Sequence, residues 1–301
     1  MNKIGFVGLG VMGSPMAANL IGKGYRVAVY NRTPGKADRL LELGAVLAGT
    51  PAEAADGADA VVTMISNDDA VNEVYYGDNG LLGGLAAGTV VVDSSTISPA
   101  LARQLAVDCA AKSADYLDAP VSGSKPAAES GQLVFMAGGD ANALKRCEPI
   151  LLAMGSKIVH LGPSGSGATA KLAVNTVLGI NTAALIEGLA IATNGGIDVA
   201  SFLELVQSGG AASRIAELKG GKLLGRDFSV QFALSLMLKD LRLASVLSDG
   251  LKTPTPVLEA VKSVFQIAEA HGFGELDLSA LAKCYEQLSG KSAAARGSED
   301  R

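Results

Sequence analysis

The sequence is poor in the residues that build metal sites and nucleophilic sites. It has two histidines and three cysteines among 301 residues, and it has no tryptophan. A histidine-rich metal site or a catalytic triad would depend on His160 and His271 alone, so we expect neither and predict no bound metal. Cys109, Cys147 and Cys284 are odd in number and widely spaced, which argues against disulfides and favours a reducing compartment.

Positive charge is also scarce. The 25 Lys and Arg residues are outnumbered by 30 Asp and Glu, and the net charge of −5 disfavours a nucleic-acid surface. The N-terminus enters a glycine motif before a signal-peptide core can form. The most apolar segment, 170–193, is interrupted by Asn175, Asn181 and Glu187 and lacks the roughly 18 uncharged apolar residues of a membrane span. We therefore expect a cytoplasmic protein with no nucleic-acid or membrane partner.

Short β-rich runs alternate with helical stretches over the first 160 residues. Strands are predicted at residues 3–7, 26–31, 60–65, 89–93, 115–119, 133–137 and 157–160. Helices are predicted between several of them, at 14–23, 36–43, 69–75 and 99–112. This alternation predicts an α/β fold with βαβ crossovers and a doubly wound, mainly parallel sheet.

The second half has a different character. Apolar residues recur there at helical spacing over 170–193, 199–207, 229–247, 256–270 and 279–288, which predicts an all-α domain. The stretch Gly-Pro-Ser-Gly-Ser-Gly at 162–167 marks the boundary, and its alternative interpretation is a flexible linker. We predict one domain over 1–163, a helical domain over 164–290 and a disordered tail over 291–301.

A glycine motif follows the first predicted strand directly. Its three glycines have the G-x-G-x-x-G spacing: the first permits a tight turn, the second lets the backbone approach a pyrophosphate, and the third lets the helix pack on the strand. The strand before, the helix after and a second strand about 20 residues later together predict a Rossmann domain that binds a dinucleotide. The residues predicted to bind the cofactor here are Gly8, Leu9, Gly10, Val11, Met12 and Gly13.

The end of the second strand indicates which dinucleotide is bound. NAD enzymes usually carry Asp or Glu at this place, where the sequence reads Tyr-Asn-Arg-Thr. Asn31 removes the carboxylate that would repel a 2′-phosphate, and Arg32 can bind such a phosphate bidentately. The sequence therefore predicts NADP(H), bound by Asn31, Arg32 and Thr33. The alternative is that Arg32 is an ordinary solvated loop residue.

Two polar residues stand out in the apolar segment after the boundary. Lys171 and Asn175 are four residues apart and share one face of the predicted helix. One interpretation is a lysine that extends toward solvent and an asparagine that bonds the helix. The other is a proton-donating lysine beside an amide that positions a substrate.

Five motifs follow one another along the chain. They are Gly-Leu-Gly-Val-Met-Gly-Ser-Pro-Met-Ala at 8–17, Asp-Ser-Ser-Thr-Ile-Ser-Pro at 93–99, Asp-Ala-Pro-Val-Ser-Gly at 118–123, the Lys171 and Asn175 pair, and Lys-Asp-Leu at 239–241. In this order they resemble the β-hydroxyacid dehydrogenase family. The roles that the resemblance implies are acid/base catalysis for Lys171 with Asn175, substrate binding for Ser122 and Gly123, and cofactor contact for Thr96 and Lys239.

The segment 122–133 resembles one branch of this family, the glyoxylate/succinic semialdehyde reductases. Ser124 then becomes a further substrate residue, where hydroxyisobutyrate and tartronate semialdehyde enzymes more often have glycine. Pro126 directly after Lys125 departs from the branch pattern. Phe232 and Asp240 fit the same branch, in which both lie at the substrate pocket. Their alternatives are a core aromatic residue and a structural ion pair.

The resemblance also implies that the backbone of Met64 and Ile65 lies along the cofactor, although Ser66 stands where family members usually carry proline. The implied reaction is reduction of glyoxylate or succinic semialdehyde with hydride from NADPH and a proton from Lys171. The alternatives are a 3-hydroxyisobutyrate or tartronate semialdehyde dehydrogenase, an imine reductase with Asp or Tyr in place of Lys171, and a non-enzymatic assembly module without that lysine. The apolar second domain further predicts a homodimer or homotetramer.

Overall fold

The computed structural model describes residues 1–290, so the tail predicted at 291–301 lies outside the described residues. The chain divides into two compact units, of which unit 1 is Met1–Leu172 and unit 2 begins at Ala173. The division falls within the long helix α9 (Ser166–Asn194), shortly after the boundary expected at residue 163.

Unit 1 is built on a sheet that is parallel from β3 through to β6. Its strands are β1 (Lys3–Val7), β2 (Arg26–Tyr30), β3 (Val46–Leu47), β4 (Ala60–Thr63), β5 (Val90–Asp93), β6 (Asp115–Asp118), β7 (Val121–Ser122), β8 (Leu133–Gly139) and β9 (Gly155–His160). The strand order is β3-β2-β1-β4-β5-β6-β8-β7, and β9 pairs with β8. Strand β8 is antiparallel to β6 and β7. The predicted doubly wound, mainly parallel sheet is confirmed.

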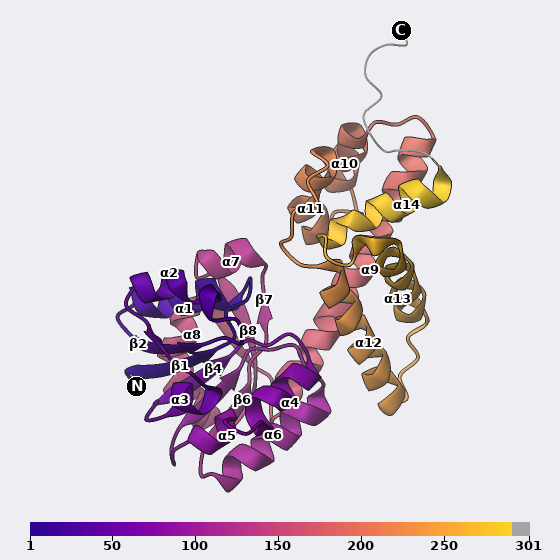
Figure 1. Ribbon diagram of the computed structural model, residues 1–301. Coiled ribbons are helices and arrows are strands. Elements are labelled where there is room, and N and C mark those ends of the chain that lie inside the picture. The colour runs from indigo at the N-terminus through magenta and orange to yellow at the C-terminus, as the bar shows by residue number, and fades with distance from the viewer. Residues whose placement is uncertain (291–301) are drawn as a thin grey trace. The chain divides into compact units, whose positions relative to one another are not determined.

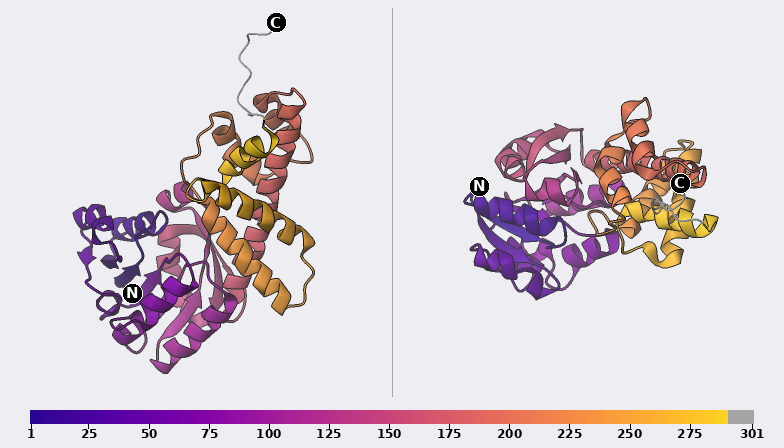
Figure 2. Two further views of the ribbon diagram at one scale, coloured as in Figure 1. Left: turned by 45° about the vertical axis from the view of Figure 1, so that its right-hand side comes forward. Right: turned by 90° about the horizontal axis from the view of Figure 1, so that it is seen from above.

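Helices cover both faces of this sheet, as Figures 1 and 2 show. They are α1 (Gly13–Gly22), the short turn η1 (Pro34–Lys36), α2 (Asp38–Glu42), α3 (Pro51–Ala55), α4 (Asp68–Tyr76), α5 (Leu81–Gly84), α6 (Pro99–Ala111), α7 (Lys125–Glu129) and α8 (Ala141–Met154). In Figure 1, α1, α2 and α8 lie on one face and α3, α5 and α6 on the other. The chain reverses its winding direction between β1 and β4, where parallel sheets of this kind bind ligands.

Two hydrophobic clusters fill the space between the sheet and these helices. In β4, Ala60 and Val62 belong to the cluster that also contains Leu20 of α1, whereas Val61 belongs to the cluster with Leu105 of α6. Every residue of β4 is buried. A strand covered on both faces reads as a continuous apolar run, which explains why this strand was predictable.

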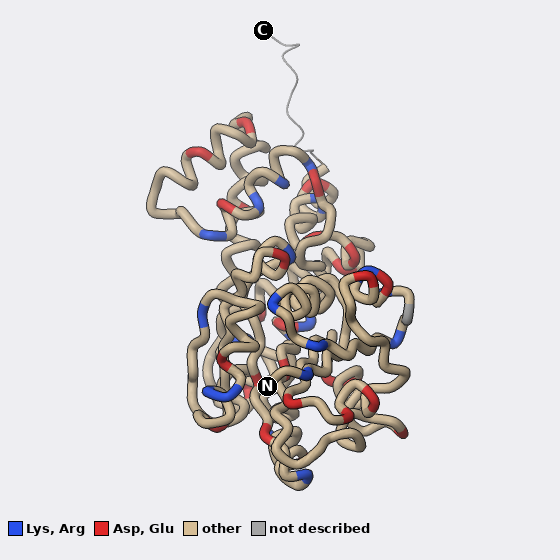
Figure 3. Tube along the Cα trace, turned by 90° about the vertical axis from the view of Figure 1, so that its left-hand side faces the viewer, with Lys and Arg blue, Asp and Glu red and all other residues tan. Residues whose placement is uncertain are grey.

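Unit 2 is helical, as predicted. Besides the continuation of α9 it contains α10 (Val199–Ser208), α11 (Arg214–Leu224), α12 (Leu234–Gly250), α13 (Pro256–Ala268), the π-helical turn η2 (Glu269–Phe273), the 3-10 turn η3 (Leu278–Ala280) and α14 (Leu281–Ser289). Helix α11 was not predicted from the sequence. Basic and acidic residues are interspersed along the trace in Figure 3.

One predicted helix begins at the wrong place. The periodicity indicated a helix from residue 229, but α12 begins at Leu234. The backbone N–H groups of Gln231 and Phe232 donate to a carboxylate oxygen of Asp277 instead of entering a helix. Ala233 then forms an isolated antiparallel bridge with Asp277.

Helix α9 has the length and composition of a membrane span. An 18-residue window reaches a mean hydropathy of 1.5, and 39% of that window is buried. The expectation that this segment lacks such composition is therefore wrong. Buried polar residues interrupt it nevertheless, because Asn175 and Thr182 are each 1% exposed and Thr182 donates to the Leu178 carbonyl. The expected absence of a membrane partner stays a prediction.

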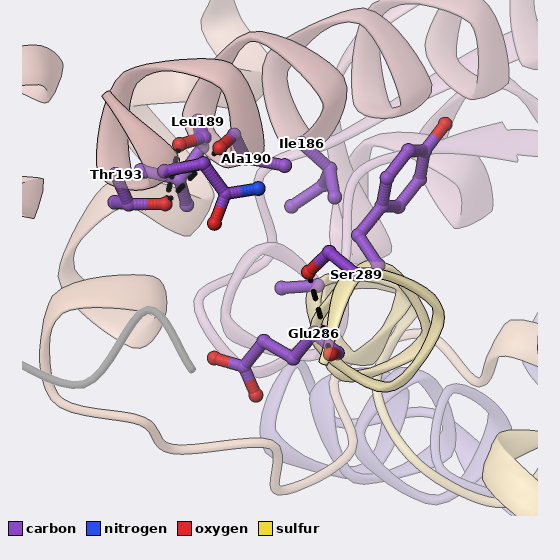
Figure 4. A pocket seen from close by; sticks show the side chains of 9 residues that line it. Ile186, Leu189, Ala190, Thr193, Glu286 and Ser289 are labelled. Carbon is purple, nitrogen blue, oxygen red and sulfur yellow. Dashed lines mark hydrogen bonds between the residues drawn. The ribbon is translucent and has the colours of Figure 1, made fainter. Parts of the chain in front are cut away.

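A small pocket lies between α9 and α14 within unit 2 (Figure 4). Its volume of about 10 Å³ is close to that of a single water site. The Thr193 hydroxyl on its wall donates to the Leu189 carbonyl, and the Ser289 hydroxyl donates to the Glu286 backbone carbonyl. This pocket is too small for an organic substrate.

Candidate active site

The glycine motif after β1 forms a turn that side chains would block. Gly8 has φ +100°, and a Cβ there would overlap the carbonyl oxygen of Met64. A Cβ at Gly13 would overlap the Gly8 carbonyl oxygen. At Gly10, by contrast, a Cβ would meet no atom within 4 Å among the residues that the structure describes. The first and third glycines are thus needed for packing, and the second leaves open space for a ligand.

Asn31 connects this turn to the loop after β2. Its Oδ1 accepts the Leu9 N–H at 2.9 Å, and its Nδ2 donates to the Thr33 carbonyl at 3.0 Å. Arg32 between them is 83% exposed and lies 3.8 Å from a carboxylate oxygen of Glu73. An exposed pair at this distance contributes little, so the Arg32 guanidinium is available for a phosphate.

These loops line a pocket of about 450 Å³, a volume typical of cofactor sites. The predicted cofactor residues in its lining are Gly8, Gly10, Asn31, Arg32, Thr33, Met64 and Ile65. In the part of the chain that the structure describes, six predicted cofactor residues are not in this lining: Leu9, Val11, Met12, Gly13, Thr96 and Lys239. The first four of these still belong to the turn itself. The predicted phosphate-binding residues therefore lie together in a pocket of suitable size for part of a dinucleotide.

Sequence reasoning missed part of the pocket lining. It includes Thr50 and Pro51 at the start of α3, Glu73 on α4 and the turn at 77–80. Thr50 is recognisable as a helix cap, since its hydroxyl accepts the Glu53 N–H. The Gly-Asp-Asn-Gly turn is recognisable from its composition. Neither signal shows that these residues face a ligand.

A buried carboxylate holds the loop that follows β4. Asp93 is 1% exposed, and its Oδ1 accepts the Thr63 hydroxyl at 2.8 Å and the Ser95 N–H at 2.9 Å. Its Oδ2 accepts the Tyr116 hydroxyl at 3.1 Å. Burial raises the pKa of Asp93, and these hydrogen bonds oppose the rise. Because Ser95 Oγ accepts the Ile65 N–H at 2.9 Å, this network fixes one edge of the pocket.

Lys171 is tied to the predicted substrate loop within unit 1. Its Nζ donates to the Val121 carbonyl at 2.8 Å, directly before Ser122. The start of α9 is fixed by Asp118, whose two carboxylate oxygens accept the Gly165 and Ala168 N–H groups at 2.8 Å each. Burial raises the pKa of Asp118, and the two backbone bonds oppose this. Asp118 is the last residue of β6, three residues before Val121. Its carboxylate therefore connects the start of α9 to the strand that precedes the substrate loop.

The loop after β7 is compact. Gly123 has φ +127°, and a Cβ there would lie 2.9 Å from the Cβ of Ala127. Ser124 precedes α7, and among the described residues its side chain makes no capping bond. Lys125 pairs with Glu129 at 3.7 Å on the exposed face of α7. The loop therefore presents Ser122 and Ser124 next to a left-handed glycine.

Three predicted site residues meet within unit 2. Asn175 and Asp240 are 1% and 2% exposed, and Asn175 Nδ2 donates to Asp240 Oδ2 at 2.5 Å. Lys239 Nζ lies 2.9 Å from Asp240 Oδ1. A Cβ at Gly179 would lie 2.9 Å from Leu241 Cδ2, so this glycine lets α12 approach α9 closely. Asp240 is thus an ion-pair partner, and its role at the substrate stays a prediction.

Both units match known protein families. Residues 3–162 match the NAD binding domain of 6-phosphogluconate dehydrogenase. Residues 165–285 match the family described as NAD-binding of NADP-dependent 3-hydroxyisobutyrate dehydrogenase. The matched ranges meet in the glycine-rich stretch at 162–167 that marks the boundary in the sequence.

Relatives match over nearly the whole chain. Glyoxylate/succinic semialdehyde reductase 2 of Arabidopsis thaliana is 36% identical over 92% of this chain and 78% of its own length. NAD-dependent L-serine dehydrogenase of Pseudomonas aeruginosa is 34% identical over 97% of this chain and 100% of its own length. The crystal structure of 3-hydroxyisobutyrate dehydrogenase from Salmonella typhimurium has a TM-score of 0.87 at 30% identity, covering 94% of this chain and 99% of that one. The chain therefore belongs to the β-hydroxyacid dehydrogenase family of NAD(P)-dependent oxidoreductases.

Proposed function

We propose that this protein reduces small aldehyde acids with NADPH, and that glyoxylate and succinic semialdehyde are its substrates. The observation that carries the proposal is Lys171, whose ammonium group is held at the Val121 carbonyl beside the Ser122 and Gly123 loop. The same unit contains the dinucleotide pocket. The sequence of the loop, with Ser124 in place of glycine, favours these two aldehydes over hydroxyisobutyrate-type substrates.

The preference for NADPH rests on the loop after β2. Asn31 carries no charge to repel a 2′-phosphate, and Arg32 is exposed at the pocket with only a long contact to Glu73. The relatives carry names with either cofactor, since one is called NAD-dependent and one matching family is described as NADP-dependent. The preference is therefore a property to measure on this chain.

In the proposed reaction the nicotinamide, when bound, supplies the hydride. Lys171 donates a proton to the carbonyl oxygen as negative charge develops there. Ser122 and the Gly123 backbone bind the substrate carboxylate, and Asp118 keeps the start of α9 in register with this loop. In unit 2, Asp240 holds the Asn175 amide with one carboxylate oxygen and the Lys239 ammonium with the other.

A panel of NADPH oxidation assays tests the proposal. The four aldehydes compared are glyoxylate, succinic semialdehyde, tartronate semialdehyde and methylmalonate semialdehyde. The reverse reaction, with NADP+ as the oxidant, is measured with 3-hydroxyisobutyrate and L-serine. The highest kcat/KM is expected for one of the first two aldehydes. A higher value for methylmalonate semialdehyde would assign the protein to the hydroxyisobutyrate branch instead.

Lys171→Ala is expected to abolish turnover and to leave NADPH binding measurable by titration, because the pocket lining does not include Lys171. Lys157→Ala, at an exposed position on β9, is the matched control and should keep wild-type kcat. Near-normal kcat in Lys171→Ala would show that another group donates the proton.

We also propose that unit 2 forms an interface between copies of this chain. Large apolar side chains are exposed on two of its helices: Val177 and Ile191 on α9 are 58% and 71% exposed, and Val246 on α12 is 72% exposed. Light scattering coupled to gel filtration should therefore give the mass of a dimer or tetramer, and Ile191→Glu should lower it. A monomeric wild-type protein would contradict this proposal.

A further inference from the structure

The 227–233 segment joins α11 to α12 and contains Phe232, which the family resemblance places at the substrate pocket. Phe232 is held by both of its backbone polar groups. Its N–H donates to Asp277 Oδ2 at 3.1 Å, and its carbonyl accepts the Leu278 N–H at 2.9 Å. The side chain itself is half-buried. The backbone at Phe232 is thus fixed by contacts from the 277–278 region, and Asp277 lies 45 residues further along the chain.

Asp277 accepts the backbone N–H groups that carbonyl oxygens would accept if this segment were helical. It is fully buried, and its Oδ2 accepts the N–H groups of both Gln231 and Phe232. Its Oδ1 accepts the N–H and the hydroxyl of Ser279 at 3.1 and 2.9 Å. Asp277 therefore links the 227–233 segment to the turn η3.

Lys219 of α11 is the cation that faces this carboxylate. Its side chain is 5% exposed, and its Nζ donates to Asp277 Oδ2 at 2.9 Å and to Gln231 Oε1 at 3.1 Å. Burial lowers the pKa of Lys219, and Asp277 opposes that shift. Burial alone would raise the pKa of Asp277, but Lys219 and the backbone N–H groups hold it below its ordinary value.

Stability alone is a poor explanation for such a pair. Removing two charges from water costs several kcal/mol per ion, and apolar residues of similar volume often replace a buried ion pair without loss. Apolar residues, however, cannot accept two backbone N–H groups. What the ionised pair supplies specifically is a fixed backbone at Gln231 and Phe232.

A second lysine on the same side of α11 binds the other end of the segment. Lys222 Nζ donates to Asp227 Oδ2 at 2.7 Å and to Ser229 Oγ at 3.0 Å. The Asp227 side chain is 56% exposed, so this contact is screened by water. Lys219 and Lys222 therefore offer a comparison between a buried and a partly exposed contact to one segment.

We propose that Lys219 and Asp277 are positioning residues for Phe232, and that they set substrate selectivity through this residue. The proposal rests on the proposed function, because only the family resemblance places Phe232 at the substrate pocket. It concerns residues other than the proton donor, and it predicts an effect on the KM of the aldehyde acid rather than on NADPH binding.

A double-mutant cycle tests the proposal. Lys219→Met is expected to raise the KM of the preferred aldehyde acid about tenfold, to change kcat less than threefold and to leave the Kd of NADPH within twofold. In a Phe232→Ala background, Lys219→Met should have almost no further effect on KM, because the residue that it positions is gone. Equal effects of Lys219→Met in both backgrounds would mean a purely structural role and would overturn the proposal.

Lys222→Met is the matched control and should leave KM within twofold of wild type. Asp277→Asn removes the charge that faces Lys219 and replaces one carboxylate oxygen with an amide donor, so it serves where Lys219→Met does not fold, with the same non-additivity expected. Amide hydrogen exchange gives a readout without substrate: the Gln231 and Phe232 amides should exchange faster in Lys219→Met than in Lys222→Met. Wild-type protection of these amides in Lys219→Met would overturn the proposal, whereas a wild-type enzyme inactive on every aldehyde acid would instead refute the proposed function.

Discussion

Replacing Asp118 with alanine removes the two hydrogen bonds that fix the start of α9. Each bond joins a backbone N–H to a buried carboxylate oxygen at 2.8 Å. Hydrogen bonds to charged groups contribute about 1.5–3 kcal/mol each, so the pair contributes about 3–6 kcal/mol. Loss of a buried carboxylate, whose pKa burial raises, returns part of that amount. We expect Asp118→Ala to lower the free energy of unfolding by about 3 kcal/mol.

In a domain of this size, about 1 kcal/mol lowers Tm by roughly 2–4 °C, so the expected decrease is about 6–12 °C by circular dichroism. Lys171 lies in the second turn of α9, and its contact with Val121 depends on where that helix begins. We therefore expect kcat to fall at least about tenfold, with little change in the Kd of NADPH.

Asp140 provides the control, because its carboxylate also accepts two backbone N–H groups, at the start of α8, but the residue is exposed. Asp140→Ala should cost about 1 kcal/mol and leave kcat unchanged. The reasoning about Asp118 would be refuted if Asp118→Ala kept its Tm within 2–4 °C of wild type and retained full kcat.

Two further predictions concern the cofactor and the thiols. Arg32→Glu should shift the NADPH/NADH ratio of kcat/KM toward NADH by at least about tenfold. Glu73→Gln, which removes the carboxylate that competes for Arg32, should not reduce the preference for NADPH. An unchanged ratio in Arg32→Glu would contradict the assignment of Arg32 to the 2′-phosphate. Burial raises the pKa of Cys109 and of Cys147 from 9.0 to about 12, so the folded state keeps both thiols protonated. The stability that this contributes is fully present below pH 9 and is lost as the pH rises toward 12. Denaturation midpoints measured from pH 8 upward should decrease, and rapid labelling of either thiol in the native protein at pH 8 would show that it is not buried.

The cofactor turn was predictable because its constraints are local. Gly8 and Gly13 approach backbone oxygens so closely that no side chain fits, and this requirement appears in the sequence as a fixed spacing of glycines. Asn31 was identified for the charge that it lacks. Its hydrogen bonds to Leu9 and Thr33 show a second role, which organises the turn itself.

The segment before α12 could not be predicted from local pattern. Val230, Leu234 and Leu238 continue the apolar spacing of the helix, so periodicity extends it toward residue 229. The interaction that overrides this pattern comes from Asp277, far along the chain, and from Lys219 on another helix. Long-range polar contacts of this kind leave no periodic signal in a single sequence.

Asp240 has a structural role in addition to the one that the family resemblance implies. Its two carboxylate oxygens are engaged separately, one by the Asn175 amide and the other by the Lys239 ammonium. Removing this carboxylate would therefore release two other predicted site residues and leave their polar groups without their buried partner. Loss of activity in an Asp240 variant would follow even if its carboxylate never contacts substrate. The direct role of Asp240 can be separated from this indirect one only by a change, such as Asp240→Asn, that keeps an acceptor for Asn175 while removing the charge that faces Lys239.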